Sequence, residues 1–319
     1  MSLPNLQQIE AAAAIVYRSM PPTPQYSWPL LNRHAGCEVW IKHENHTPVG
    51  AFKIRGGLVY MDWLRRRHPE VTTIVSATRG NHGQSLAYAG ALYGLRVVIV
   101  VPACNSREKN AAMRALGAEL VEVEGDFSDA GDHAIQLEQT NGWHRVKSYD
   151  PHLVAGVSTY ALEFLRAQSR LETVYVPLGM GSGVLGMVAA RDALGLSTEV
   201  VAVISSHARA QALSFASGEV VEDAADTRIA DGVACRRPDP GALGVLRTHL
   251  RRLVEVTDDE VEDAMRLYFA ATHNVAEGAG AIGLAALLKD RVKPGSRVGT
   301  VLCGGNVDSD VFARVLARG

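Results

Sequence analysis

Lys53 is a lysine with mostly apolar and glycine neighbours, in the stretch KHENHTPVGAFKIRGG. It follows Phe52 and stands shortly before Arg55. Burial near a second cation would lower the pKa of the lysine amine, and a lysine that forms a Schiff base needs that change. Since most lysines are solvated surface groups, this residue indicates chemistry only together with other motifs.

A glycine-rich stretch, LGMGSGVLG, follows the apolar segment TVYVPL and leads into a helical pattern. Its glycines are Gly179, Gly181, Gly183 and Gly186. Glycines at the start of a helix leave backbone N–H groups open to an anion, which favours a phosphate-binding loop. The last three also fit the dinucleotide pattern G-x-G-x-x-G. That pattern needs an acid after the next strand, where the chain offers Ser205, Ser206 and Arg209. An NAD site is therefore disfavoured, and an NADP site stays open as an alternative.

Two more polar turns follow apolar segments. In SATRGNHGQSLAYAG, Arg79 stands beside Gly80 and Asn81 at the expected start of a helix, where backbone N–H groups attract anions. The stretch CGGNVD, which begins with Cys303, follows the apolar segment 297–302. Ligands of parallel sheets bind at the carboxyl ends of the strands. We therefore expect these turns and the glycine-rich loop to line one cleft.

The histidines nearest Lys53 do not form a metal motif. His43 and His46 flank Glu44, a spacing that differs from that of metalloprotease helices. Pro48 also argues against a helix there. We expect no metal site in this stretch.

Apolar strands alternate with helical patterns from about residue 74 onward. Gly117 and Gly142 are favourable residues for ending two of the helices, and Thr257 with Glu260 forms a capping box that begins another. The alternation predicts an α/β fold with parallel sheets covered by helices on both faces. Residues 221–244 are expected to form a long irregular segment.

Composition limits the class of protein. The chain has 319 residues, of which 47% are hydrophobic and 21% charged, with a net charge of -2, as in a globular protein of one large domain or two lobes. No Lys/Arg-rich run indicates nucleic-acid binding, and no apolar run is long enough to span a membrane. The N-terminal stretch is not expected to be a signal peptide. The four cysteines are far apart, so we expect reduced thiols in a cytoplasmic protein.

Four motifs together resemble fold-type II (β-family) pyridoxal-phosphate enzymes, and within them the serine/threonine dehydratase and serine racemase group. Members carry K-x-E-x5-G-S-F-K-x-R-G, S-x-G-N-H-x-Q, a tetraglycine loop and S/C-G-G-N. The corresponding residues here are Lys42, Glu44, Gly50 to Gly56, Thr78 to Gln84, Gly179 to Ser182, and Cys303 to Asn306. The motifs stand in the family's order across essentially the whole chain.

The resemblance implies a two-lobed fold. Each lobe would be an open, mostly parallel twisted sheet with helices on both faces, and pyridoxal 5'-phosphate would bind in the cleft between the lobes. Residues 1–48 and 149–319 would form the large cofactor-binding domain, and residues 49–148 the small domain. A homodimer and a small amino-acid substrate are implied as well, with no nucleic-acid or membrane partner.

The resemblance also implies roles for individual residues. Lys53 would carry the cofactor covalently and, once released by the substrate amine, would remove the Cα proton. Phe52 would lie beside the cofactor ring, Asn81 would bind the ring hydroxyl, and Cys303 would face the pyridine nitrogen. The cofactor phosphate would be held by Gly179, Met180, Gly181, Ser182 and Gly183. The substrate carboxylate would be surrounded by Thr78, Gly80 and His82.

A thiol at Cys303 favours elimination. A carboxylate in its place would keep the ring nitrogen protonated and make the cofactor a deep electron sink, whereas a neutral thiol does not. β-Elimination expels its leaving group as the Cα proton is lost, so it needs that sink less than transamination does. The cofactor phosphate is the expected acid for the leaving hydroxide, with no side chain required.

Arg79 departs from the family pattern, which has serine or alanine there. The serine of racemases supplies a proton, whereas arginine stays protonated, so racemase activity is disfavoured. Three interpretations stay open. Arg79 could point outward and pair with a surface acid, bind a second anionic or polar group of the substrate such as a β-carboxylate, or bind the α-carboxylate.

Two further departures concern metal binding and support of the site. Ile204 and Ser205 stand where metal-activated relatives place a glutamate, so divalent-cation activation is not expected. Asp231, Gly232 and Glu277 fall in family-like stretches near the expected site. We expect their role to be structural rather than chemical.

The expected function is that of a pyridoxal-phosphate-dependent dehydratase or ammonia-lyase, which converts a β-hydroxy-α-amino acid such as threonine or serine to a 2-oxo acid and ammonia. Phenylserine, 3-hydroxyaspartate and a diamino acid are alternative substrates for the same type of elimination. Outside the family, an NADP-binding oxidoreductase would leave Lys53 and Cys303 unexplained. A non-catalytic amino-acid-binding protein is disfavoured by the presence of Lys53.

Overall fold

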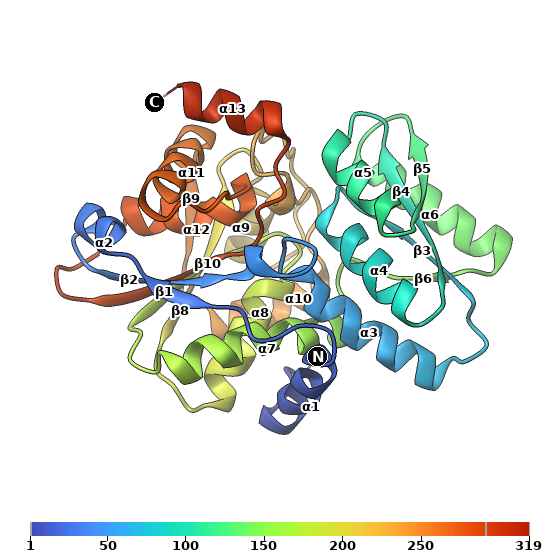
Figure 1. The fold of residues 1–319 in the computed structure, drawn as a ribbon, viewed down its shortest axis with the longest axis horizontal. Helices are drawn as coiled ribbons and strands as arrows, with labels where there is room; N and C mark the ends of the chain where they lie inside the picture. Colours follow the sequence, from blue (N-terminus) through green and yellow to red (C-terminus); the bar gives the residue numbers. More distant parts are fainter. Residues whose placement is uncertain (1, 291, 319) are drawn as a thin grey trace.

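The computed structural model of the protein describes residues 2–290 and 292–318. The strands form two sheets, which lie in two lobes side by side (Figure 1). The order in the large sheet is β1 (Gln25–Ser27), β2 (Glu38–His43), β10 (Arg297–Leu302), β7 (Thr173–Pro177), β8 (Glu199–Ser205) and β9 (Leu253–Val256). The order in the small sheet is β5 (Glu119–Val123), β4 (Arg96–Pro102), β3 (Thr73–Ala77) and β6 (His144–Arg145). β1 is antiparallel to β2, and the other pairings between described strands are parallel.

Helices cover both sheets. The small lobe carries α4 (Asn81–Leu92), α5 (Arg107–Ala115) and α6 (Phe127–Asn141) (Figure 1). The other helices are α1 (Leu6–Val16), α2 (Pro29–Ala35), α3 (Lys53–Arg67), α7 (Pro151–Ala167), α8 (Ser182–Ala193), α9 (Ala210–Ser217), α10 (Pro240–His249), α11 (Asp258–Thr272), α12 (Gly278–Lys289) and α13 (Ser309–Ala317). Two short 3-10 turns, η1 (Glu44–His46) and η2 (Asp231–Val233), stand between them. None of the described helices is both long and apolar enough to cross a membrane.

The strand β4 shows why the small sheet is covered on both faces. Ile99 packs with residues of α3 and α4, whereas Val98 and Val100 pack with Ala130 of α6. Successive side chains of a strand point to opposite faces, so a continuous apolar run needs helices on both sides. The predicted α/β fold with helices on both faces of parallel sheets is confirmed.

Helix α3 contacts both lobes, because it packs against α4 of the small lobe and α7 of the large one. Two glycines bring α3 and α7 close together. A Cβ on Gly156 would lie 2.2 Å from the Arg55 carbonyl oxygen, and a Cβ on Gly56 would lie 2.9 Å from that of Leu153. The first turn of α3 is thereby placed by the large lobe. The division into residues 1–48 with 149–319 and residues 49–148 stays a prediction.

The helix boundaries follow the expected local signals at several points. Thr257 and Glu260 form the predicted capping box at the start of α11. Gly142 ends α6 with a φ of 67°, and Gly117 follows α5 with a φ of 90°, a region that favours glycine. These predictions are confirmed.

The predicted irregular segment, 221–244, extends too far. Residues 218–239 are irregular apart from η2, but α10 begins at Pro240. Asp239 caps this helix, accepting a hydrogen bond from the Ala242 amide at 3.0 Å. A capping aspartate followed by proline is a signal for a helix start, and it decides the structure here.

Candidate active site

One cavity, of about 260 Å³, lies where the turns after strands of both sheets meet. Its walls come from the turn after β3, the loop after β7, the end of β10 and the start of α3. The cavity is lined by every residue that the sequence predicted for the site: Phe52, Lys53, Thr78, Arg79, Gly80, Asn81, His82, Gly179, Met180, Gly181, Ser182, Gly183 and Cys303. The three turns therefore share one cleft, as expected.

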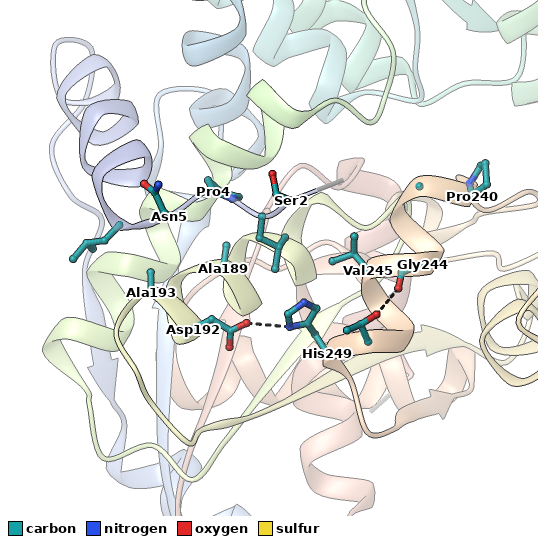
Figure 2. A pocket seen from close by; sticks show the side chains of 14 residues that line it. Ser2, Pro4, Asn5, Ala189, Asp192, Ala193, Pro240, Gly244, Val245 and His249 are labelled. Atoms are coloured by element: carbon teal, nitrogen blue, oxygen red, sulfur yellow. Dashed lines mark hydrogen bonds and ion pairs between the residues drawn. The ribbon is translucent and has the colours of Figure 1, made fainter.

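A more open hollow, of about 810 Å³, lies between the N-terminal segment, α8 and α10 (Figure 2). Its side chains include one acid–histidine pair, in which His249 Nδ1 lies 3.0 Å from Asp192 Oδ2. Its described lining contains no lysine, arginine or cysteine and none of the predicted site residues. We therefore place the chemistry in the cavity between the lobes.

Lys53 begins α3 and reaches the cavity with its amine. Its Nζ donates to Ser182 Oγ at 3.1 Å and lies 4.9 Å from the centre of the Phe52 ring. Burial lowers the pKa of Lys53 to about 8, against a smaller effect of Cys303 that raises it. An amine with this pKa is neutral much more often than an exposed lysine, which suits covalent chemistry.

Arg55, the expected second cation beside Lys53, forms buried ion pairs instead. Its Nε lies 2.7 Å from Glu44 Oε2, and its Nη1 lies 2.6 Å from Glu163 Oε1. Lys42 Nζ contacts Glu163 Oε2 at 2.5 Å. Breaking a buried ion pair leaves an uncompensated charge, so this network holds the first turn of α3 on η1 and α7, with Lys42 of β2 bound to the same Glu163. The pKa of Lys53 is lowered by burial, and the prediction that a second cation lowers it was wrong.

The loop between β7 and α8 keeps backbone amides open to the cavity. Gly181 precedes α8 with a φ of 108°, and no side chain caps the helix, so its first N–H groups are available to a ligand. A Cβ on Gly179 would lie 2.7 Å from the Gly232 carbonyl oxygen. Gln211 Nε2 donates to the Gly179 carbonyl oxygen at 2.6 Å and holds the loop in place. This loop could bind a phosphate.

Arg209, which kept an NADP site open as an alternative, does not line the cavity. Its Nε lies 2.9 Å from Glu255 Oε2, so its charge is already paired. An NADP site needs a free arginine for the 2'-phosphate. The NADP interpretation of the glycine-rich loop therefore loses its support.

The turn after β3 presents a second open helix start. Gly80 precedes α4, and no side chain caps the helix. The Gly80 amide donates to Thr78 Oγ1 at 3.1 Å. His82 is buried in the first turn, and its Nε2 has no partner among the described residues. Burial, together with Lys53, lowers the pKa of His82 to about 3, so the ring is neutral. These groups could surround a carboxylate.

Asn81 is held by one side chain and faces another. Asn306 Nδ2 donates to Asn81 Oδ1 at 2.9 Å, and Asn81 Nδ2 donates to Glu277 Oε1 at 2.5 Å. Glu277 is buried, and burial raises its pKa despite the opposing effect of Lys109. The Asn81 amide therefore presents a donor at the cavity wall.

Lys109 of the small lobe meets two acids of the large lobe. Its Nζ lies 2.7 Å from Asp231 Oδ2 and 3.2 Å from Glu277 Oε2. Burial alone would lower the pKa of Lys109, but the two carboxylates raise it, so the amine stays charged. The sequence indicated a structural role for Asp231 and Glu277. Both also line the cavity, where they position Lys109 and Asn81.

Cys303 carries a neutral thiol at the end of β10. Its Sγ donates to the Ala279 carbonyl oxygen at 3.3 Å. Burial raises the pKa of Cys303, and the Glu277 carboxylate raises it further. A buried thiol with a raised pKa is not a nucleophile, and it does not act as a counter-ion.

Arg79 faces the cavity without a partner. Its Nε is buried with no hydrogen bond, and no described residue forms an ion pair with its guanidinium. The interpretation of an outward arginine paired with a surface acid was therefore wrong. Two other arginines of the cavity are paired, Arg236 with Asp126 and Arg237 with Glu222.

Several cavity residues were missed by sequence reasoning. They are Lys109, Phe127, Ser128, Gly131, Ser148, Arg236 and Arg237. Lys109 and Ser128 stand a few residues after β4 and β5, so the rule that ligands bind at strand ends could have found them. Arg236 and Arg237 belong to the irregular segment, where no local pattern predicts their position.

Comparison with known proteins gives one consistent family. A family model described as pyridoxal-phosphate dependent enzyme matches residues 16–304. The L-threonine ammonia-lyase of Thermotoga maritima is 30% identical over 292 residues, which are 91% of this chain and 72% of the relative. The L-threo-3-hydroxyaspartate ammonia-lyase of Pseudomonas sp is 31% identical over 300 residues, which are 92% of each chain. The crystal structure of a pyridoxal 5'-phosphate-dependent aspartate racemase superposes with a TM-score of 0.91 and 27% identity, covering 98% of this chain and 99% of its own.

The cavity fits this cofactor. An amine with a lowered pKa, as at Lys53, can bond to an aldehyde, and the open N–H groups after Gly181 can bind a phosphate. The Asn81 amide can donate to a ring hydroxyl. The chain belongs to the family of pyridoxal-phosphate dependent enzymes, and pyridoxal phosphate is its cofactor.

Proposed function

We propose that this enzyme is an ammonia-lyase that acts on a β-hydroxy-α-amino acid of the threonine or serine type and releases a 2-oxo acid and ammonia. The observation that carries the proposal is that the Lys53 amine, the uncapped start of α4 and the neutral Cys303 thiol meet in one cavity. Two relatives, at 30% and 31% identity, are ammonia-lyases for L-threonine and L-threo-3-hydroxyaspartate, and they support it.

The residues around Lys53 would hold the cofactor. Bound pyridoxal phosphate makes the Cα–H bond of an attached amino acid acidic by withdrawing electrons from it. Lys53 would hold the cofactor covalently, the loop 179–183 would bind its phosphate, and Asn81 would donate to its ring hydroxyl. The full set of cofactor-binding residues would be Phe52, Lys53, Asn81, Gly179, Met180, Gly181, Ser182, Gly183 and Cys303.

Lys53 would also be the catalytic base. Once the substrate amine has displaced it, its Nζ receives the proton from Cα. The Cβ–O bond would break as that proton leaves, and the hydroxide would depart as water with a proton supplied by the cofactor phosphate, while Lys53 Nζ keeps the proton from Cα. The released enamine then takes up one water and loses ammonia, so one substrate gives one 2-oxo acid and one ammonia. Ser182 Oγ, which accepts a hydrogen bond from Nζ, keeps the amine in the cavity.

The start of α4 would bind the α-carboxylate of the substrate. Its open N–H groups carry the positive end of the helix dipole, which stabilises an anion. Thr78, Gly80 and His82 surround this position. His82 is neutral and adds a polar contact without a charge.

Cys303 would favour elimination over reactions that need a protonated ring nitrogen. Its raised pKa keeps the thiol neutral, so it offers no negative charge to hold a proton on the cofactor. Loss of a leaving group from Cβ removes the developing charge at Cα at once. The site would therefore favour β-elimination over reactions that need a protonated ring nitrogen.

We propose further that the enzyme is a cytoplasmic homodimer whose large domain comprises residues 1–48 and 149–319 and whose small domain comprises residues 49–148. The family resemblance supports the dimer. The scattered cysteines, without a C-x-x-C pair, support a reducing compartment.

The first experiment tests the covalent cofactor and the reaction together. We expect the purified protein to absorb visible light, to lose that absorbance on borohydride treatment, and to carry the reduced cofactor on Lys53. We expect the holoenzyme to release a 2-oxo acid and ammonia in equal amounts from at least one β-hydroxy-α-amino acid.

The control is Lys53→Ala, which keeps the phosphate loop but lacks the amine. This variant should bind pyridoxal phosphate without the covalent bond that borohydride reduces, and it should form no 2-oxo acid. A protein that cannot be loaded with pyridoxal phosphate, or a loaded protein that forms no 2-oxo acid from any such substrate, contradicts the proposal.

A further inference from the structure

We propose that Arg79 binds a second carboxylate of the substrate, so that the preferred substrates are β-hydroxy-α-amino acids with a carboxylate on Cβ, as in 3-hydroxyaspartate. This inference rests on the proposed ammonia-lyase function and names its substrate class. The product from such a substrate would be a four-carbon 2-oxo diacid, with ammonia released as before.

The first argument is the unpaired charge of Arg79. The residue stands in the turn between β3 and α4 and lines the cavity. Its Nε is buried without a hydrogen bond, and none of residues 2–290 and 292–318 pairs with its guanidinium. Arg79 as a whole is half-buried, but its guanidinium is always charged, and the buried Nε is left without a partner, which is costly. An unpaired arginine in this position therefore indicates a binding site for an anionic group of the substrate.

The second argument is that the neighbouring cations are already paired. Lys109 Nζ contacts Asp231 and Glu277, at 2.7 Å and 3.2 Å. Arg236 pairs with Asp126 of the α6 cap, and Arg237 Nε lies 3.4 Å from Glu222 Oε1. These acids compete with any ligand for their cations. Apart from Lys53, which the cofactor occupies, Arg79 alone among the described cavity residues offers an unpaired positive charge.

The third argument counts the anions that the site must hold. The cofactor phosphate has the uncapped start of α8, and the substrate α-carboxylate has the uncapped start of α4. Each is a set of backbone N–H groups that needs no side chain. Arg79 is a third anion receptor, and a monocarboxylic substrate such as threonine brings no third anion. A carboxylate on Cβ does, and the planar guanidinium can bind it with two parallel hydrogen bonds.

Part of the cavity lining is small and polar, which leaves room for this group. Ser128, Gly131 and Ser148 face the same space, and a Cβ placed on Gly131 would have no atom within 4 Å. These residues add hydroxyl groups and volume without adding a negative charge. The two acids of the lining, Asp231 and Glu277, are both paired with Lys109, which reduces their repulsion of a bound carboxylate.

The test compares a dicarboxylate with a monocarboxylate of the same length on the holoenzyme. Succinate has the carbon skeleton and the two carboxylates of 3-hydroxyaspartate, and butyrate lacks one of them. A hydrogen-bonded ion pair contributes about 1.5–3 kcal/mol, so succinate should bind about 10- to 100-fold more tightly than butyrate in a calorimetric titration. Arg79→Ser should remove the difference, and Arg79→Lys should retain part of it. The matched control Arg237→Ser removes a paired cation from the same cavity and should leave the difference intact.

Kinetics give the second readout. In Arg79→Ser, kcat/KM for 3-hydroxyaspartate should fall about 10- to 100-fold, while kcat/KM for threonine changes little. Equal losses for both substrates would mean that Arg79 binds the α-carboxylate, and would overturn the inference. A wild-type preference for threonine or phenylserine would overturn it too.

The two proposals fail in different ways. If the loaded wild-type enzyme forms no 2-oxo acid from any substrate, the ammonia-lyase proposal fails, and the succinate and butyrate titrations still decide the role of Arg79. If it turns over threonine but binds succinate no better than butyrate, only the inference about Arg79 fails. The titrations use the wild-type protein, so they stand even if a variant does not fold.

Discussion

Asn306 Nδ2 donates a hydrogen bond to Asn81 Oδ1 at 2.9 Å and a second one to the Val49 carbonyl oxygen at 2.8 Å. Because Asn81 Oδ1 is occupied, the amide nitrogen of Asn81 is the end that faces Glu277 at the cavity wall. An asparagine amide can otherwise present either end to a ligand. Asn306 therefore determines that Asn81 acts as a donor.

Asn306→Ala should weaken cofactor binding without removing any cofactor contact. Without Asn306 the Asn81 amide is oriented only by its hydrogen bond to Glu277, so part of the population can turn and present an acceptor to the ring hydroxyl. Loss of one hydrogen bond corresponds to about 1 kcal/mol, and we expect the Kd of pyridoxal phosphate to rise about fivefold. Titration of the apoprotein followed by fluorescence measures this change. Asn141→Ala, at the exposed end of α6, is the control, and an unchanged Kd for Asn306→Ala would refute the prediction.

Gly179→Ala should displace the phosphate-binding loop. The added Cβ would lie 2.7 Å from the Gly232 carbonyl oxygen, which is backbone and cannot swing aside. We expect the Kd of pyridoxal phosphate to rise at least about tenfold, because the N–H groups of the loop lose their alignment. Gly244→Ala in α10 is the matched control, since its Cβ meets no atom within 4 Å and should leave the Kd as it is. Equal Kd values for the two variants would show that the loop tolerates the shift.

The pKa of Lys53 predicts how cofactor loading depends on pH. Only the neutral amine attacks an aldehyde, and with a pKa of about 8 the neutral fraction of Lys53 is about one half at pH 8 and about nine tenths at pH 9. The rate at which the apoprotein gains visible absorbance should therefore climb with pH and level off between about pH 9 and 10. Free Nα-acetyl-lysine, whose side-chain amine has an ordinary pKa of about 10.4, should still gain rate above about pH 10. Parallel profiles for the two amines would mean that Lys53 is not desolvated.

His82 predicts loss of stability in acid. Its pKa is lowered from 6.5 to about 3 in the folded protein, so between these values the unfolded chain binds a proton that the folded chain does not. The free energy of unfolding should then decrease as pH falls from about 6.5, by up to about 1.4 kcal/mol per pH unit for this one group. His82→Gln removes the titrating group, so its stability should decline less steeply in urea unfolding at pH 6.5, 5.5 and 4.5. The exposed His34→Gln serves as control, and a slope for His82→Gln equal to that of wild type would contradict the assignment.

The sequence predicted that the site residues line one cavity, for a physical reason. Lys53, the 179–183 loop and Cys303 each follow an apolar strand or begin a helix, and parallel strands bring such ends together. Side-chain partners were harder to predict. Arg55 was expected to act on Lys53, but its charge is neutralised by Glu44 and Glu163, which come from elements far apart in the chain.

The acids around Lys109 show the same limit. Asp231 lies in an irregular segment and Glu277 precedes a helix of the other lobe, so no local periodicity connects them with α5. The orientation of Arg79 was equally undetermined, because an arginine after a strand can face solvent or a cavity. Its direction depends on which acids lie within reach, and that is decided only when the lobes have packed.

The buried network of Arg55 has a mechanical consequence. It attaches the first turn of α3, and Lys53 with it, to η1 and α7, although the rest of α3 extends toward the small lobe. Residues 78–82 are carried by the small sheet. A rotation of one lobe against the other would thus change the spacing between the Lys53 amine and the carboxylate receptor, while the amine and the phosphate loop would move as one body. If the proposed roles hold, such a rotation would change substrate binding while leaving the attachment of the cofactor to Lys53 and the 179–183 loop unchanged.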